Sequence, residues 1–312
     1  FWVISQTLLI LAAYLMYRWI AMFISFRIVA KVFLYVWQIC IVLTVALVTI
    51  YSIFIISSSE SQISDLLGKN ASLIELNLNQ IKENNLDMLS LIKKDQKFIN
   101  ALSNSNIGEI ENSIGSFISS NSFLDKVQVL DSTGLLIFDS ESVTSESLDL
   151  QNNYVIKSTI YTRSETSGFV IESYSTSQDN SLVYYFAVPI LKDDGAIIGI
   201  IASSKDIDDS YLDLLKDQTD QELVVYINNK RSASTLVERD GVSRLQNIPL
   251  VLSETLSTKG NVAFYKGRIL STSYYFAVLG LQMNDSENTA NLVISVPQRD
   301  FVESTQSSLS KI

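Results

Sequence analysis

Histidine is absent from the 312-residue chain, and Cys40 is its only cysteine. The lack of histidine removes the commonest general base, the usual transition-metal ligand and the side chain that titrates near neutral pH. A lone cysteine excludes both an internal disulfide and a thiolate metal site. The phosphate-cradling motifs G-x-G-x-x-G and G-x-x-x-x-G-K-[ST] are also missing. These absences point to a protein stretch without a cofactor.

The same absences leave little room for catalysis. Without histidine or a cysteine outside the apolar N-terminal part, a hydrolase would need a Ser-Lys pair or paired carboxylates. No such constellation is evident in the sequence. We therefore expect that this stretch is not an enzyme, and an extracytoplasmic hydrolase is the weakest of the alternatives considered below.

Acidic residues are confined to the part of the chain beyond residue 56. Residues 1–56 contain three basic residues, Arg18, Arg27 and Lys31, and no acidic one, whereas the whole chain has a formal net charge of −10. A small basic, apolar part is thus joined to a strongly acidic one. Nucleic acid is excluded as a partner, because phosphate binding needs a basic face.

Two apolar stretches in the first 56 residues predict a membrane anchor. A helix of roughly 20 residues crosses the hydrocarbon core; residues 32–56 exceed that length, while residues 1–17 are just long enough and could instead lie at the interface. The basic residues lie between these stretches or just before the second, which places the connection in the cytoplasm and residues from about 57 onward outside. A cleaved signal peptide fits poorly, because the second stretch is too long for its apolar region.

Beyond the membrane segment, the pattern predicts helices and then strands. Residues 57–103 show helical spacing of Ile63, Leu67, Ile74, Leu78 and Leu89, with Leu66 and Ile81 on the same stripe, so we expect a long amphipathic helix. Shorter helices are expected at 108–121, 209–221, 247–260 and 298–312. Strand-like runs are expected at 126–132, 134–140, 154–163, 168–177, 181–191, 196–204, 222–229, 232–237, 261–267, 268–280 and 291–297.

The pentapeptide YYFAV occurs twice, at 184–188 and at 274–278. Each copy lies in an apolar run followed by an acidic turn, a second apolar run and a basic-acidic pair, namely Lys205-Asp206 and Arg299-Asp300. Because apolar side chains fill both parities of these runs, both faces of each strand should be covered. We interpret the chain as two copies of one α+β module.

This order of elements resembles the double Cache sensory domains of bacterial transmembrane receptors, which are PAS-like. The resemblance rests on VQVLDSTGLLIFDS (127–140), FAVPILKDDGAIIGII (186–201) and the segment 211–247, which has the helix, Thr-containing turn, strand, Ser-Thr-Leu and Asp-Gly of the subgroup common in sensor kinases and nucleotide cyclases. It covers residues 57 to 300. The expected fold class is α+β, with N-terminal transmembrane helices, a long amphipathic helix and two antiparallel-sheet modules in tandem.

The resemblance also implies a domain organisation and a function. Residues 1–56 would be the transmembrane anchor, 57–207 the long helix with the membrane-distal module, 208–297 the membrane-proximal module, and 298–312 a return helix toward a further span. The chain would be the extracytoplasmic input of a receptor in the bacterial inner membrane, acting as a homodimer and signalling to an output domain outside this sequence. The output could be that of a chemoreceptor, a sensor kinase or a nucleotide cyclase.

The predicted ligand site lies in the distal module. Tyr161 and Arg163 are two residues apart in a predicted strand and would face one side, where Tyr174, Tyr185 and Ser203 could join them. An arginine among tyrosine hydroxyls suits a small anion or carboxylate, because its fork pairs with two oxygens. An amino-acid ligand is not implied, since the Arg-x-Trp-Tyr type motif of amino-acid-binding relatives is missing.

Simpler interpretations stay open for the same residues. Arg163 could be a solvated residue at the end of a loop, with the tyrosines as ordinary sheet aromatics. The whole module could then be structural or protein-binding, with no small-molecule ligand. Asp139, Asp193 and Asp194 suggest hairpin turns rather than calcium, because the alternating ligands of a calcium loop are missing.

Overall fold

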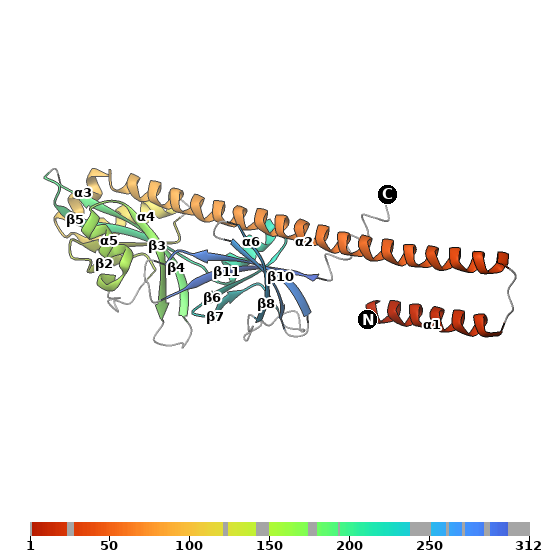
Figure 1. Ribbon diagram of the computed structural model, residues 1–312. Helices are drawn as coiled ribbons and strands as arrows, with labels where there is room; N and C mark the ends of the chain where they lie inside the picture. The colour runs from red at the N-terminus through yellow and green to blue at the C-terminus, as the bar shows by residue number, and fades with distance from the viewer. Residues whose placement is uncertain are drawn as a thin grey trace. The chain divides into compact units, whose positions relative to one another are not determined.

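The computed structural model of the chain describes residues 2–23, 28–120, 124–141, 150–173, 180–192, 194–237, 251–259, 262–269, 272–283 and 288–298. The predicted return helix, apart from its first residue, lies outside these ranges. The chain divides into two compact units, Phe1–Gln62 and Ile63–Ile312. The elements of both units are labelled in Figure 1.

The first unit is entirely helical where it is described. Helix α1 spans Trp2–Phe23, and helix α2 begins at Ile28 and continues to Ile92 in the second unit. Within α2, the segment Val32–Tyr51 is long and apolar enough to cross a membrane, and none of it is buried against protein. This segment agrees with the span predicted at 32–56. The apolar segment found in α1, Ile10–Ile20, is shorter, so the span at 1–17 stays a prediction.

The second unit contains two antiparallel sheets. The first has the strand order β2-β1-β5-β4-β3. Its strands are β1 (Lys126–Asp131), β2 (Leu136–Asp139), β3 (Thr166–Ser173), β4 (Asn180–Leu191) and β5 (Ile197–Asp206). Helices α3 (Gln96–Ser103) and α4 (Ile107–Ser120) precede it, and the short 3-10 helix η1 (Leu150–Asn152) and α5 (Tyr154–Thr162) lie between β2 and β3 in the chain.

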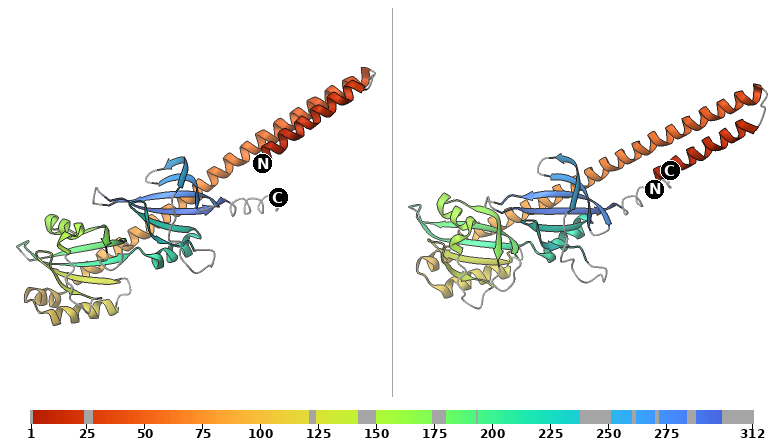
Figure 2. Two further views of the ribbon diagram at one scale, coloured as in Figure 1. Left: turned by 90° about the horizontal axis from the view of Figure 1, so that it is seen from below. Right: turned by 60° about the horizontal axis from the view of Figure 1, so that its bottom comes forward.

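The second sheet repeats this order with one strand added. After α6 (Asp209–Thr219), the strands pair as β7-β6-β11-β10-β9-β8. They are β6 (Glu222–Ile227), β7 (Lys230–Ser234), β8 (Val251–Lys259), β9 (Val262–Ile269), β10 (Thr272–Leu281) and β11 (Ala290–Pro297). In spatial order β7, β6, β11, β10 and β9 match β2, β1, β5, β4 and β3. The views of Figure 2 show the two sheets as separate bodies. The predicted fold class, two tandem antiparallel-sheet modules after a long helix, is confirmed.

One helix, α2, packs against an apolar face of both sheets. A single hydrophobic cluster joins the α2 stripe, including Ile63, Leu67 and Ile74, to one face of each sheet, represented by Phe186 and by Ala277. Figure 1 shows this part of α2 running along both sheets. The predicted stripe is buried at Ile63, Leu67, Ile74, Leu78 and Leu89 and half-buried at Ile81, but Leu66 is 38% exposed.

The predicted strand at 154–163 is wrong, because this segment forms α5. Its β-branched run favours a strand by propensity, but the N-cap decides the outcome. The side chain of Asn153 accepts hydrogen bonds from the backbone N–H groups of Val155 and Ile156, at 2.9 and 3.5 Å. The helix ends at Arg163, whose left-handed backbone (φ 53°) lets its N–H donate to the carbonyl of Thr159.

Two further boundaries differ from the prediction. The long helix ends at Ile92, and Asp95 caps a separate helix, α3, by accepting a hydrogen bond from the N–H of Lys97 at 3.0 Å. The described part of the predicted helix at 247–260 is strand β8, which pairs along its length with β9. Local helical spacing is a weak preference there, and the sheet edge offers a ladder of backbone hydrogen bonds that overrides it.

The repeated pentapeptide occupies matching strands but is out of phase. In β4, Tyr184 and Phe186 face the cluster shared with α2, while Tyr185 faces the opposite side. In β10, the residue that faces the shared cluster is Tyr275, and Phe276 faces away. A shift of one residue exchanges the two faces of a strand. The modules are thus equivalent in strand order, whereas the five identical letters are not equivalent positions.

Gly199 offers a test of how tightly β5 is packed. A Cβ there would lie 2.6 Å from the carbonyl oxygen of Leu130 and 2.9 Å from Leu102. Gly199→Ala should therefore destabilise the protein by about 1–3 kcal/mol, through forced backbone movement. The matched control is Gly115→Ala in α4, where a Cβ meets nothing within 4 Å, and which should stabilise by up to about 1 kcal/mol. Melting temperatures of the full chain in one detergent check both; equal effects would contradict the packing described.

Candidate functional site

The structure separates the five residues of the predicted site. Tyr161 lies on α5 and is 91% exposed, and Arg163 is exposed at the C-cap of the same helix. They do not share a strand face as predicted, because the segment is helical. Tyr174 lies outside the described residues, and its role stays a prediction.

Tyr185 and Ser203 lie on opposite faces of the first sheet. In the register of β4 and β5, Tyr185 pairs with Ser204 and Phe186 pairs with Ser203. Ser203 therefore faces α2, where its hydroxyl donates a hydrogen bond of 2.9 Å to the side-chain carbonyl oxygen of Asn85. Only Tyr185 among the predicted residues that are described faces the side where α5 packs, so a common pocket for Tyr185 and Ser203 is excluded by the register.

The α5 side of the first sheet has an apolar half and a polar half. Under α5 and η1, Val155, Ile156 and Leu150 pack on Ala187 and Ala202 in a buried cluster. The small alanine side chains allow the helix to approach the sheet closely. Polar side chains occupy the neighbouring rows of the same face, and we call them the polar strip: Lys126, Gln128, Asp139, Glu172, Tyr185, Ser204 and Asp206.

Hydrogen bonds and ion pairs connect the members of the polar strip. The amide nitrogen of Gln128 donates to a carboxylate oxygen of Asp139 at 2.9 Å, and the ammonium of Lys126 lies 3.7 Å from the same carboxylate. The hydroxyl of Tyr185 donates to the carboxylate of Glu172. Several of these groups are buried, with Gln128 fully inaccessible and Tyr185 only 1% exposed. Ser204 is also buried, whereas Lys126, Asp139 and Glu172 are half-buried and Asp206 is exposed. A polar surface with a buried part and an open part can receive a small molecule.

Gln128 and Asp206 differ from the other members of the strip in their surroundings. The side-chain oxygen of Gln128 is buried and has no hydrogen-bond partner among the described residues. Partial loss of hydration raises the pKa of the Asp206 carboxyl, and the negative charges of Glu172 and Asp208 add to this effect while Lys126 opposes it. Gln128 thus offers a buried acceptor, and Asp206, which is itself exposed, lies in locally negative surroundings.

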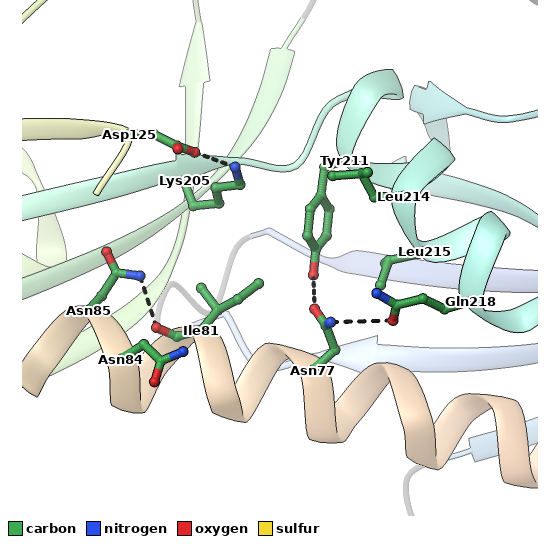
Figure 3. A pocket seen from close by; sticks show the side chains of 10 residues that line it. All are labelled: Asn77, Ile81, Asn84, Asn85, Asp125, Lys205, Tyr211, Leu214, Leu215 and Gln218. Carbon is green, nitrogen blue, oxygen red and sulfur yellow. Dashed lines mark hydrogen bonds and ion pairs between the residues drawn. The ribbon is translucent and has the colours of Figure 1, made fainter. Parts of the chain in front are cut away.

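A second polar site lies where the two modules meet α2. A recess of about 230 Å³, which we call the junction recess, is lined by α2, by the first module and by α6. Figure 3 shows Tyr211 of α6 pointing at Asn77 of α2, while Asp125 and Lys205 form an ion pair on the side of the first module. Its remaining lining residues are Ile81, Asn84, Asn85, Leu214, Leu215 and Gln218.

Three asparagines of α2, in or near this recess, form hydrogen bonds with α6 or with the first module, and we call them the amide row. Asn70 donates to the backbone carbonyl of Thr219 at 3.3 Å. Asn77 accepts from the hydroxyl of Tyr211 at 2.9 Å and donates to the side chain of Gln218 at 3.5 Å. Asn85 accepts from Ser203 of the first module. Burial raises the pKa of the Tyr211 hydroxyl well above its ordinary value, so it remains a donor at every physiological pH.

A smaller recess of about 200 Å³ lies between α2, α5 and the start of β3. Lys82, Tyr154, Ser158 and Glu165 contribute to its lining. Glu165 is engaged with Ser90 at 2.8 Å and with Lys93 at 4.0 Å. Within the described ranges, no group of three or more His, Cys, Asp or Glu side chains is arranged to hold a metal ion.

Sequence reasoning missed Gln128, Asp139, Glu172 and Asp206. A signal was present in KVQVLD, where Gln128 interrupts a run of valines at a position that alternates with them. A polar residue inside a buried strand needs a partner. The identity of its neighbours, however, depends on the pairing of β1 with β2 and β5, which is not visible in one sequence.

Comparisons with known proteins agree with this architecture. A family model described as "Double sensory domain of two-component sensor kinase" matches residues 60–302. No curated protein matches the sequence. The matched descriptions are of sensory domains and not of catalytic ones, in agreement with the expectation that this stretch is not an enzyme.

Solved structures with the same fold include two from Vibrio. The periplasmic domain of LuxQ from Vibrio cholerae is 12% identical, with a TM-score of 0.51, covering 75% of this chain and 99% of that one. A domain of a sensory box/GGDEF family protein from Vibrio parahaemolyticus is 14% identical, with a TM-score of 0.50, covering 79% and 98%. At these identities the likeness is one of fold alone.

The bond between Asn77 and Tyr211 is testable by a double-mutant cycle. Asn77→Leu should destabilise the protein by about 1–3 kcal/mol, because it leaves a buried phenol without its acceptor. In a Tyr211→Phe background the same change should cost less, with a coupling of at least about 0.5 kcal/mol. Asn84→Leu is the control, because Asn84 is exposed on the same helix and has no hydrogen bond within the described structure. Strictly additive effects on unfolding would refute the bond.

Asp206 should make stability depend on pH in a defined direction. Its pKa is raised above the ordinary 3.8 in the folded chain, so between these two values the folded state binds more protons than the unfolded state. Stability therefore falls as pH rises through that window. Asp206→Asn should raise the melting temperature at neutral pH and flatten its rise on acidification, whereas Asp217→Asn, an exposed position on α6, should do neither. A lower melting temperature for Asp206→Asn at neutral pH would contradict the shift.

Proposed function

Because the chain belongs to the family of double sensory domains of two-component sensor kinases, we propose that residues 57–312 are the extracytoplasmic, ligand-sensing input of a bacterial receptor. The apolar segment of α2, Val32–Tyr51, would anchor it in the inner membrane. The basic residues Arg18, Arg27 and Lys31 before this segment support placing the connection that precedes it in the cytoplasm and the residues from about 57 onward outside.

The observation that carries the proposal is the polar strip on the α5 side of the first sheet, in which Gln128, Tyr185 and Ser204 are buried. A structural module that fills its own interior would satisfy its buried polar groups or replace them by apolar ones. Here Gln128 keeps an unsatisfied oxygen at a fully buried position. A small molecule held by the strip would satisfy that oxygen, which a purely structural module leaves unexplained.

The domain boundaries proposed are those of the two modules. Residues 57–207 would hold the long helix and the ligand-binding module, 208–297 the second module, and 298–312 the return toward the membrane. Ligand binding would act by preferring one arrangement of these parts over another, and a difference in affinity of a few kcal/mol is enough for a large change in populations.

A homodimer through α2 is part of the proposal. Leu73 and Leu76 are 50% and 53% exposed on this helix. Leu66, seven residues before Leu73 and ten before Leu76, is 38% exposed. Exposed leucines seven and ten residues apart on a helix favour a helical partner. The residues of the opposite stripe are already buried under the sheets.

Ligand binding can be tested by thermal shift on the full chain in nanodiscs. Across a library of small metabolites, a true ligand at about 100 times its Kd should add roughly 2.7 kcal/mol to the stability of the folded state. Tyr185→Phe and Ser204→Leu should weaken that stabilisation, the first by removing the bond to Glu172 and the second by filling the strip.

Two controls locate the site. Ser203→Ala changes the opposite face of the sheet, and Arg163→Ala changes an exposed helix end. Both should keep the ligand-dependent shift. Loss of the shift in Arg163→Ala but not in Tyr185→Phe would move the site to α5, and a complete absence of hits would overturn the sensing function itself.

A further inference from the structure

We propose that the junction recess is a second binding site, and that it takes a small neutral polyhydroxylated molecule such as a monosaccharide or a linear polyol. This site lies on the α2 side of the first sheet, whereas the polar strip occupies the opposite face. The inference therefore goes beyond the sensing site proposed above and does not depend on it.

The volume of the recess limits the size of its occupant. It holds about 230 Å³, less than the roughly 300–1,000 Å³ of pockets for drug-sized ligands. Three of its lining side chains are buried, with Tyr211 and Asn85 each 5% exposed and Leu215 1% exposed. Others are open to solvent, since Gln218 is exposed and Leu214 is 60% exposed. A molecule of monosaccharide size can thus enter from solvent and contact buried, ordered side chains.

Amide side chains of the recess offer hydrogen bonds that the protein itself does not use. The Tyr211 hydroxyl donates to Asn77, whose amide nitrogen lies 3.5 Å from the side-chain oxygen of Gln218 (Figure 3). Within the described part of the chain, the amide nitrogen of Gln218 and the whole side-chain amide of Asn84 have no hydrogen-bond partner. Both side chains are exposed, so water solvates them when the recess is empty. A hydroxyl donates and accepts as an amide does, so a hydroxyl-rich molecule can replace that water without leaving a group unpaired.

The charges of the recess favour a neutral occupant. Asp125 and Lys205 form an ion pair, and the other lining residues are uncharged. The two opposite charges cancel, so the recess has no net charge to attract an anion or a cation. The aliphatic side chains of Ile81, Leu214 and Leu215 complete the lining and suit the C–H faces of a sugar ring. A molecule with hydroxyls for the amides and C–H groups for the aliphatic side chains is a sugar or a polyol.

The experiment compares neutral sugars with charged molecules of similar size. The full chain in nanodiscs is titrated with a panel of aldoses and linear polyols that includes glucose, galactose, ribose and mannitol. Glucuronate, glucosamine and alanine serve as the anionic, cationic and zwitterionic comparisons. Thermal shift and titration calorimetry are measured at low millimolar concentrations, because concentrated sugars stabilise proteins in general by exclusion from their surface. Saturable binding of one or more neutral molecules, and not of the charged ones, is the expected result.

Variants connect the binding to the recess. Asn84→Leu and Gln218→Leu should each weaken it at least about tenfold, because each removes a hydrogen-bonding group from the lining. Both residues are exposed, so neither change should prevent folding. Asn79→Leu is the matched control, since Asn79 is exposed on the same helix and is not among the residues that line the recess. It should leave the affinity unchanged.

Each outcome has a definite meaning. Binding limited to glucuronate, glucosamine or alanine would overturn the neutral class of ligand. Sugar binding that Asn84→Leu and Gln218→Leu leave unchanged would place it outside the recess, and its loss in Tyr185→Phe would place it at the polar strip. No saturable binding by any neutral molecule would overturn the site itself. The sensing function is tested by the library screen with Tyr185→Phe and Ser204→Leu, so the two proposals fail separately.

Discussion

The fold of the second unit depends on the burial of one stripe of α2 by two sheets. The stripe of α2 from Ile63 to Ile92 belongs to a single hydrophobic cluster that includes one face of each sheet. Full burial of each such leucine or isoleucine contributes roughly 1.5–3 kcal/mol. Because the stripe is shared, neither sheet completes its core without the helix. The opposite faces of the sheets, where they are described, do not contact α2. In the first module that face carries the polar strip.

Much of this fold was predictable because its signals are periodic. Helical spacing predicted the stripe of α2, and alternating or continuous apolar runs predicted ten of the strand segments. The misassigned segments, α5 and β8, have preferences that tertiary contacts override. At α5 a β-branched run yields to the cap at Asn153, and at β8 a helix-like spacing yields to pairing with β9. The partner of β8 lies outside that segment, whereas the cap of α5 is the residue directly before it.

The candidate site was less accessible to prediction, because it depends on register. Tyr185 was identified, but Ser203 was placed beside it although Ser204 is its neighbour across the strands. The same sensitivity appears in the repeated YYFAV, whose two copies turn opposite faces to the shared core. The sequence shows which residues of a strand share a face. Which of the two faces turns to the core depends on how the strand is paired. Charge balance on the polar strip is likewise a property of five strands together.

The amide row has a mechanical implication for α2 and α6. One helical turn on either side of Asn77, the α2 surface offers Ile74 and Ile81, neither of which can accept a hydrogen bond from the Tyr211 hydroxyl. The asparagines seven residues away, Asn70 and Asn84, lie two turns along the helix, which corresponds to about 10.5 Å along the axis. Sliding by one turn would place the Tyr211 hydroxyl beside one of these isoleucines and remove its acceptor. The bond between Tyr211 and Asn77 therefore opposes sliding of α6 along α2.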